Sequence, residues 1–515
     1  MSPRFDVAIV GSGFAGSILA RVLARRRLSV VLVERGRHPR FALGESSTPL
    51  AALSLERLAA RWDLPDLHAL AAWGRWQKRL PQLRRGLKRG FTFYRHHPDA
   101  EFTNTAANEH RLLVAASPDD HVADAHWLRA DVDAHLVREA VAAGVTYRDE
   151  TELDGLERAS DGFRLVGRDP RGRVELSASR VVDASGGRGF LAGHIDLGER
   201  QVPFSSGLVY GHFTGLAPFP EVARATGARL DPGPYPDEAA AVHHLLDEGW
   251  VYALPFDREG SGRQVVSCGL VLHGDELARI SGASPTEIWR GVLDRYPTLA
   301  RCFTTAEPVR ELATIPRLQY RRCTAAGEGF FLLPHAYAFF DPLFSTGIAW
   351  SLLAVERLAD VLCDEAPTER YAALLETEAD WIEALIGAAY RTLNDFPRFA
   401  ALTFLYFAAA SFAESEQRLL PDLPRPHWRG FLGAGDPVLG PLPAEAAAHL
   451  ETGEDAASFE RWLLAAVAPR DVAGLGDPAR RNLYPLDLDV LVERAQLLGL
   501  TPDQVRTALP RLRGV

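Results

Sequence analysis

Residues 6–34 read DVAIVGSGFAGSILARVLARRRLSVVLVE, and this stretch decides the fold of the N-terminal part of the chain. Asp6–Val10 is a short apolar run, and the glycine-rich turn GSGFAG (11–16) follows it at once. A helical pattern then runs from Ser17 to Arg27, and a second apolar run covers Ser29–Val33. The order of the elements is therefore strand, tight turn, helix and strand.

Each part of this unit suits the binding of a dinucleotide. Gly11, Gly13 and Gly16 permit a tight turn and a close approach of the backbone to a pyrophosphate. The helix N-terminus offers unpaired N–H groups and a partial positive charge to the phosphates. Glu34, at the end of the second strand, can accept hydrogen bonds from a ribose. The sequence therefore predicts a dinucleotide-binding βαβ unit.

Length and charge limit the classes of protein that remain. The chain has 515 residues, of which 47% are hydrophobic, and this length predicts two or three domains. The formal net charge of -10 argues against a nucleic-acid partner and against an anionic membrane surface. The most apolar stretch, Leu402–Ala413, is too short to span a bilayer and is expected to form a buried helix or the wall of an apolar substrate site.

Cysteines and histidines predict no metal site. The four cysteines are far apart in sequence and form no CxxC pair. The histidine pairs 96–97 and 243–244 are adjacent residues that do not share one helical face, and the sequence contains no HExxH. The residues before the glycine-rich turn leave no room for a signal peptide, so a reducing cytoplasm is expected.

Periodicity outlines the rest of the chain. Residues 61–110 are rich in aromatic side chains and are expected to form a segment inserted over the cofactor. Residues 148–200 predict strands with a hairpin, and residues 201–325 predict mixed strand and loop. Helices are predicted for His126–Tyr147, Ile348–Leu362, Tyr371–Leu393, Phe459–Val467 and Leu486–Leu498.

Five segments together resemble the flavin-dependent halogenases and, more widely, the FAD monooxygenases with one nucleotide-binding domain. They are GSGFAG (11–16), HPRFALGESSTP (38–49), HWLRADVDAHL (126–136), VVDASGG (181–187) and DPLFSTG (341–347). The resemblance implies an α/β fold: a Rossmann-like, doubly wound FAD-binding domain, an antiparallel-sheet substrate domain and a helical C-terminal region. The FAD-binding domain is expected to comprise residues 1–60, 111–200 and 326–365, the substrate domain 61–110 and 201–325, and the helical region 366–515.

The same resemblance implies roles for individual residues. The residues expected to hold FAD are Gly11, Gly13, Phe14, Ala15, Gly16, Glu34, Arg40, Ser46, Arg129, Asp183, Asp341 and Gly347. Halide is expected near the backbone amides of Thr346 and Gly347, where a helix N-terminus suits an anion. In the family, reduced FAD and O2 oxidise chloride or bromide to hypohalous acid, which attacks an electron-rich aromatic.

A lysine carries this oxidant to the substrate in the family, either by hydrogen bonding hypohalous acid or as a haloamine. Only Lys78 and Lys88 are lysines in this arginine-rich chain, and Lys88, in LKRGFTFYRH, resembles the catalytic one. A buried lysine can lose its proton and act as a nucleophile, whereas arginine stays protonated. Lys88 is therefore the expected catalytic residue.

Two departures from the family pattern leave a second interpretation open. The halogenase Trp-x-Trp-x-Ile-Pro segment corresponds here to GWVYALPF, with tyrosine in place of the second tryptophan. Pro334 and His335 replace the Gly-Asp that relatives carry before the DP segment. The alternative is an FAD monooxygenase or dehydrogenase without halide chemistry. A third interpretation is a flavoprotein-like binding module that catalyses no reaction. The expected substrate pocket comprises Trp250, Tyr252, Pro255, Phe93 and His335.

The expected partners are small molecules and one protein. No second dinucleotide fingerprint is visible, so reduced FAD is expected from a separate flavin reductase. The expected substrate is a phenol, pyrrole or indole of secondary metabolism, free or tethered to a carrier protein.

Overall fold

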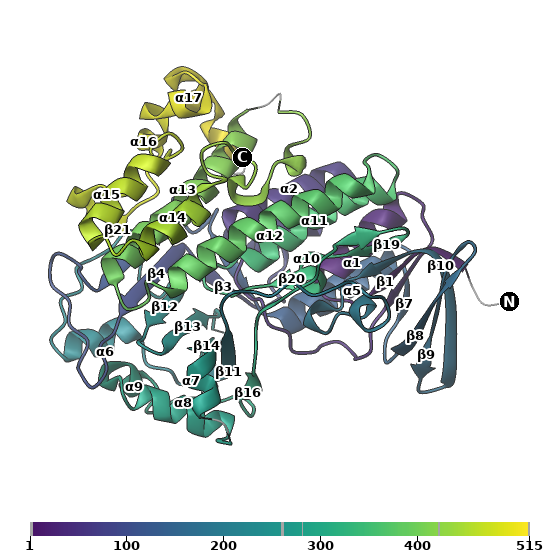
Figure 1. The fold of residues 1–515 in the computed structure, drawn as a ribbon, viewed down its shortest axis with the longest axis horizontal. Helices are drawn as coiled ribbons and strands as arrows, with labels where there is room; N and C mark the ends of the chain where they lie inside the picture. Colours follow the sequence, from purple (N-terminus) through teal and green to yellow (C-terminus); the bar gives the residue numbers. More distant parts are fainter. Residues whose placement is uncertain (1–3, 259–261, 281, 421–422, 513–515) are drawn as a thin grey trace.

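The computed structural model of the chain describes residues 4–258, 262–280, 282–420 and 423–512. Figure 1 shows two sheet-containing parts side by side, with the helices of the C-terminal part lying across them.

The first sheet contains the predicted βαβ unit. Its strands lie in the order β18 (Ala326–Gly327), β19 (Phe330–Leu332), β10 (Gly172–Asp183), β1 (Arg4–Val10), β2 (Val30–Val33) and β7 (Thr146–Arg148). The pairs from β19 to β7 are parallel, and the hairpin of β8 (Glu152–Ala159) and β9 (Gly162–Asp169) extends β10 on the antiparallel side. Strands β1 and β2 are mostly buried because α1 (Phe14–Arg25) packs against them, and α5 (Arg129–Ala142) contacts β7. Helix α11 (Thr346–Leu362) packs against α1.

The second sheet is mostly antiparallel. Its strands lie in the order β15 (Glu307–Pro308), β11 (Ser206–Thr214), β14 (Val265–His273), β13 (Gly249–Pro255), β12 (Ala241–Leu245), β4 (Gly90–Arg95), β5 (Arg111–Ala115) and β21 (Leu483–Tyr484), and β16 (Ala313–Ile315) also pairs with β11. The helices along these strands are α6 (Phe219–Ala225), α7 (Gly274–Arg279), α8 (Pro285–Leu293) and α9 (Pro297–Cys302). Residues 111–115 thus lie in this sheet, although the sequence placed them in the FAD-binding part.

The helices and strands that lie outside the two sheets, between residues 49 and 127, include one strand where the sequence predicted a helix. They are α2 (Pro49–Trp62), α3 (Pro65–Leu70), α4 (Trp73–Arg79), β3 (Arg85–Lys88) and β6 (Asp124–Trp127). The helix predicted to begin at His126 begins at Arg129, because residues 124–127 pair as an antiparallel strand with residues 85–88. The apolar periodicity of this stretch did not reveal its strand partner.

The C-terminal part is helical. Its helices are α12 (Thr368–Tyr390), α13 (Phe396–Leu419), α14 (Leu442–Glu451), α15 (Ala456–Val467), α16 (Leu488–Glu493) and α17 (Pro502–Leu512). The short elements α10 (Pro334–Tyr337), β17 (Tyr320–Arg321) and β20 (Ala338–Phe339) precede α11, and a 3-10 turn at Ala495–Leu498 breaks the helix predicted over residues 486–498. The helix around the apolar stretch 402–413 is longer than that stretch: by length and composition α13 could cross a membrane, but 78% of its most apolar window is buried inside the protein.

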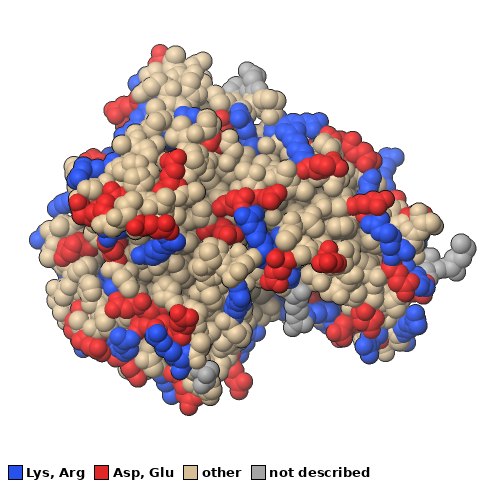
Figure 2. Space-filling view, viewed as in Figure 1, with Lys and Arg blue, Asp and Glu red and all other residues tan. Residues whose placement is uncertain are grey.

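Charged side chains are scattered over the outside of the fold. Figure 2 shows groups of lysine or arginine next to groups of aspartate or glutamate, with broad areas of other residues between them. The pattern is that of a solvated surface and agrees with the net charge of -10.

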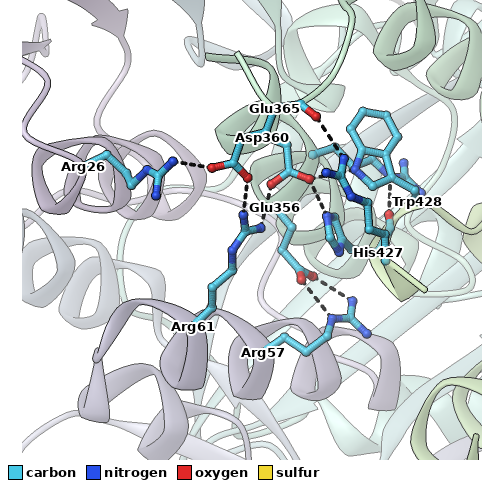
Figure 3. A network of polar contacts seen from close by, with 10 residues as sticks. Arg26, Arg57, Arg61, Glu356, Asp360, Glu365, His427 and Trp428 are labelled. Atoms are coloured by element: carbon cyan, nitrogen blue, oxygen red, sulfur yellow. Dashed lines mark hydrogen bonds and ion pairs between the residues drawn. The ribbon is translucent and has the colours of Figure 1, made fainter. Parts of the chain in front are cut away.

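Inside the fold, an ion-pair network joins α2 to α11. Arg57 binds both carboxylate oxygens of Glu356, at 2.8 and 2.7 Å. Asp360 accepts hydrogen bonds from Arg61 at 2.6 Å, from Trp428 Nε1 at 2.8 Å, and contacts His427 Nε2 at 2.7 Å (Figure 3). Burial acts to raise the pKa of Asp360, but the hydrogen bonds from His427, Trp428 and Arg61 outweigh it, and the pKa lies well below its usual range.

Asp360→Asn should lower the free energy of unfolding by about 2 kcal/mol at pH 7, because the amide cannot replace a carboxylate among these donors. The native pKa is depressed, so this contribution is present above the unfolded pKa of about 4 and disappears as the pH falls through the native pKa. Urea unfolding at pH 7 and at lower pH measures the difference. Asp154→Asn, at an exposed ion pair with Arg168, is the control and should change stability by less than about 0.5 kcal/mol. An Asp360→Asn effect of equal size at every pH would contradict the role given to the carboxylate.

Candidate functional site

A cavity of about 1170 Å³ lies where the parallel strands of the first sheet end. Its wall contains the glycine-rich turn, residues 40–46, the start of α11 and strands of the second sheet. Typical small-molecule sites measure roughly 300–1,000 Å³, so this space is large enough for a dinucleotide. The carboxyl ends of parallel strands are where α/β folds bind such ligands.

The glycine-rich turn requires its glycines. Gly11 has a φ of +107°, and a Cβ there would lie 2.4 Å from the carbonyl oxygen of Ala184. A Cβ on Gly16 would lie 2.2 Å from the carbonyl oxygen of Gly11, so α1 can pack against the turn only when residue 16 is glycine. Gly13 precedes α1 and lines the cavity, which leaves the first N–H groups of the helix directed toward a ligand.

Glu34 lies at the end of β2 and lines the cavity. Its carboxylate accepts hydrogen bonds from Ser12 Oγ at 2.9 Å, from Gly36 N at 3.0 Å and from Arg40 at 2.9 Å. Burial acts to raise the pKa of Glu34, but Arg40 and these hydrogen bonds outweigh it and lower the pKa. The group is therefore an ionised acceptor at the position predicted for a ribose contact.

Arg129 joins the segment 40–46 to α5. Its guanidinium binds both oxygens of Asp133 at 2.9 Å and donates to the carbonyls of Leu43 and Gly44 at 2.6 and 3.1 Å. It also lies 4.7 Å from the ring centre of Phe14, at the start of α1. Arg129 thus fixes the loop that forms one wall of the cavity.

Glu45 is a cavity residue that the sequence did not single out. Only 3% of it is exposed, and its carboxylate lies 3.1 Å from Nε2 of His212, on β11. Glu45 belongs to the GESSTP segment quoted above, so the motif was visible, but its partner lies 167 residues away in sequence. The pair connects the two sheets at the cavity.

The loop before α11 forms the opposite wall. Asp341, Ser345 and Gly347 line the cavity, whereas Thr346 is buried beside them and does not. Asp341 accepts hydrogen bonds from Leu343 N at 2.9 Å and from the hydroxyl of Tyr390, and burial raises the pKa of Asp341 to about 7. The N–H groups of the first turn of α11 are available here to an anion.

His335 lies where the family resemblance leads us to expect an acidic residue. It lines the cavity, and a Cβ on Gly347 would lie 2.7 Å from its Nε2. Within the described part of the chain, this Nε2 has no hydrogen-bond partner. Burial, together with the charge of Arg129, lowers the pKa of His335 to about 4, so the imidazole is neutral at pH 7.

Aromatic side chains of the second sheet close the cavity. Trp250 and Tyr252, on β13, line it, and so does His243 on β12, which the sequence set aside as one of two adjacent histidines. Phe93 lies behind His243 with a ring-centre distance of 4.7 Å, and Pro255 lies at the end of β13; neither lines the cavity. The predicted substrate residues are thus divided between the cavity surface and the layer behind it.

Asp183 also lies outside the cavity lining. It is fully buried at the end of β10 and accepts hydrogen bonds from Ser185 N at 2.9 Å, Ser185 Oγ at 2.6 Å and Leu191 N at 2.7 Å. Its carboxylate therefore shapes the loop 184–193, parts of which face the cavity.

Lys88 is fully buried and does not line the large cavity. Its Nζ donates a hydrogen bond of 2.6 Å to the carbonyl oxygen of Ser47 and lies 3.9 Å from the ring centre of Phe91. Ser46 lines the large cavity, and Pro49 lines a second, smaller cavity of about 70 Å³. The amine thus bonds to a short segment, 46–49, whose first residue lines the large cavity and whose last residue lines the small one.

Asp124 faces Lys88 across the β3–β6 pair. Burial lowers the pKa of Lys88 and raises that of Asp124, and each charge partly offsets the effect on the other. The nearby imidazoles of His126 and His243 are neutral, because burial and the charge of Lys88 lower the pKa of each to about 3. The sequence missed Asp124 because only the tertiary pairing of two short strands places it beside Lys88.

The large cavity suits the FAD that the sequence predicted. Of the predicted cofactor residues, those that line it are Gly11, Gly13, Phe14, Ala15, Gly16, Glu34, Arg40, Ser46, Arg129, Asp341 and Gly347. The close backbone contacts at Gly11 and Gly16 and the acceptor at Glu34 match the demands of a pyrophosphate and a ribose. Among the described residues, no group of three His, Cys, Asp or Glu side chains is placed to hold a metal ion.

Two halogenases are similar to this chain in sequence. The chain is 28% identical over 412 residues to monodechloroaminopyrrolnitrin halogenase PrnC of Pseudomonas fluorescens. The aligned region covers 77% of this chain and 69% of the relative. The chain is also 28% identical over 427 residues to tetracycline 7-halogenase of Kitasatospora aureofaciens, with 79% of this chain and 73% of the relative covered.

Solved structures share the fold. The structure of halogenase PltM in complex with phloroglucinol and FAD matches with a TM-score of 0.81 at 22% identity, covering 93% of this chain and 99% of that chain. The sequence profile described as FAD dependent oxidoreductase (DAO) matches residues 6–312. Since this match spans more than half of the chain, the protein belongs to the family of FAD dependent oxidoreductases.

Proposed function

We propose that this enzyme is a flavin-dependent halogenase that uses reduced FAD, O2 and chloride or bromide to halogenate an electron-rich aromatic. The observation that carries the proposal is the position of Lys88. Its buried amine donates to Ser47, the neighbour of a residue that lines the cavity suited to FAD, and its cross-strand neighbour Asp124 lines a second cavity. The halogenases among its relatives support the same chemistry.

The glycine-rich turn, Glu34 and Arg129 would hold the FAD, which when bound in reduced form supplies the electrons that activate O2. The backbone N–H groups at Gly347 would bind the halide ion. Neutral His335 beside Gly347 leaves that position without a negative charge that would repel the halide.

Lys88 would bring the oxidant to the aromatic. It either hydrogen bonds hypohalous acid or forms a haloamine, in which an N–halogen bond replaces an N–H bond and water is released. The ring carbon then attacks the halogen, the N–halogen bond breaks, and the ring proton is lost as the amine is restored. The lowered pKa of the buried amine supports this role, because the neutral form is the nucleophile.

The enzyme needs a source of reduced FAD and an aromatic substrate. Its reduced FAD would come from a separate flavin reductase in a reducing cytoplasm. The substrate would be a small aromatic of secondary metabolism, either free or tethered to a carrier protein, as the names of two pyrrole halogenating relatives indicate for those enzymes.

A test supplies the enzyme with reduced FAD, O2, bromide and a panel of phenols, pyrroles and indoles, and measures products by mass spectrometry. A brominated product is expected. A hydroxylated product without bromine would favour the alternative, an FAD monooxygenase, which Tyr252 in place of the family tryptophan motivates. If product formed equally well without reduced FAD, both the halogenase and the monooxygenase assignments would be contradicted.

A further inference from the structure

The second cavity lies beside the strand pair that carries Lys88, because Asp124, the cross-strand neighbour of Lys88, lines it. It is formed by residues of α2, α4 and the turn before it, the loop 116–122, β6, α13 and the segment 486–491, which are far apart in sequence. Pro49, Pro118 and Leu488 give it apolar surfaces that suit the edge of an aromatic ring. Its volume of about 70 Å³ is smaller than the roughly 150 Å³ of a cavity that holds benzene, so it fits one end of a substrate.

Most charged groups of this cavity are already paired with one another. Arg418 binds Glu56 at 2.6 Å and Glu414 at 2.8 Å, and Arg75 also binds Glu56. These four side chains therefore pair mainly with one another, although within the described residues Arg75 Nε has no hydrogen-bond partner.

Asp124 is different. It lines the same cavity and is only 2% exposed, yet its Oδ2 has no hydrogen-bond partner among the residues that the structure describes. A buried carboxyl oxygen without a partner costs about 1–3 kcal/mol, and a ligand that donates to it recovers this energy. A carboxyl group keeps an acceptor oxygen in both protonation states.

We propose that the second cavity is a substrate subsite in which Asp124 accepts a hydrogen bond from a hydroxyl or N–H group on the aromatic ring that is halogenated at Lys88. Asp124 and Lys88 are cross-strand neighbours, so the carboxyl group that would hold the ring lies on the strand next to the amine that would halogenate it. The subsite rests on the proposed halogenation and selects phenols, anilines and ring N–H heterocycles over their O- or N-methylated analogues. Asp124 is thus a specificity-determining residue.

Binding of phenol and anisole to the FAD-loaded enzyme, measured by ligand-observed NMR titration without halide, tests the subsite independently of turnover. Wild type should bind phenol at least tenfold more tightly than anisole, the lower end for one hydrogen bond to a carboxylate. Asp124→Leu should abolish this preference, and Asp124→Asn, which keeps an acceptor oxygen, should retain most of it. Asp154→Asn, on the exposed β8, is the matched control and should leave the preference unchanged.

A second variant covers the case in which Asp124→Leu fails to fold. Leu488→Trp fills the cavity from the C-terminal side without replacing Asp124 or Lys88, and should weaken phenol binding at least tenfold while FAD affinity stays unchanged. An unchanged preference in Asp124→Leu, or unchanged phenol binding in Leu488→Trp, would overturn the subsite. Failure of wild type to halogenate any aromatic, with Asp124-dependent phenol binding intact, would instead refute the proposed reaction.

Discussion

Lys88→Met should lower the rate of product halogenation on the order of 10²–10⁴-fold while oxidation of reduced FAD continues. Methionine has nearly the length of lysine, so the buried volume is preserved while the amine that bonds to Ser47 is lost. The groups that hold FAD do not include this side chain, because Lys88 lies outside the lining of the large cavity. Oxidation of the flavin and halogenation of the aromatic should therefore become uncoupled.

Stopped-flow absorbance follows flavin oxidation, and mass spectrometry quantifies the halogenated product in the same reaction. Lys88→Arg should be as inactive as Lys88→Met, because a guanidinium stays protonated and cannot form a haloamine. Lys78→Met is the matched control: Lys78 is the other lysine of the chain, lies exposed on α4 and should retain full activity. A Lys88→Arg enzyme with wild-type rates would refute the role of the amine.

Gly16→Ala should weaken FAD binding roughly 10- to 100-fold. The added Cβ would lie 2.2 Å from the carbonyl oxygen of Gly11 and 3.0 Å from the Cβ of Ala184, so α1 must move away from the turn. Overpacking of this kind costs roughly 1–3 kcal/mol, and a displaced helix N-terminus no longer presents its N–H groups to the phosphates. Each 1.4 kcal/mol corresponds to about a tenfold change in affinity.

Fluorescence titration with FAD measures the effect, and thermal unfolding of the cofactor-free protein shows whether the variant is folded. Gly291→Ala, on α8, is the control, because a Cβ there meets no atom within 4 Å and the helix lies away from the large cavity. Wild-type FAD affinity in a folded Gly16→Ala protein would show that the turn does not hold the cofactor.

The features that the sequence predicted are local ones. The sequence predicted the turn at residues 11–16, its flanking strands and Glu34, which are contiguous in the chain. A short motif is enough to specify the backbone geometry of such a unit. The family segments around Arg129 and Asp341 are also short, and both residues line the large cavity.

The features that the sequence could not predict are pairings between distant segments. Asp124 meets Lys88 only because two short strands pair, and the apolar periodicity of residues 126–147 favoured a helix instead. Glu45 and His212 are separated by 167 residues, and Tyr390, from the helical C-terminal part, binds Asp341. No local pattern encodes such contacts, since they depend on how sheets and helices pack.

Tertiary packing also decides which of the predicted site residues line the large cavity and which lie behind it. Thr346 and Gly347 are neighbours at the start of α11, yet only Gly347 faces the cavity. Phe93 lies one layer behind His243, which the sequence had dismissed as one of an adjacent pair. Which face of an element points inward follows from the tertiary arrangement.

Transfer of halogen from the protein to an aromatic after the flavin has gone tests the role of Lys88 most directly. The enzyme is mixed with reduced FAD, O2 and bromide, separated from flavin and free bromide by rapid gel filtration, and then given the aromatic that wild type brominates. The proposed haloamine at Lys88 predicts brominated product from wild type, at most one bromine per chain, and none from Lys88→Met. Equal yields from the two proteins would contradict it.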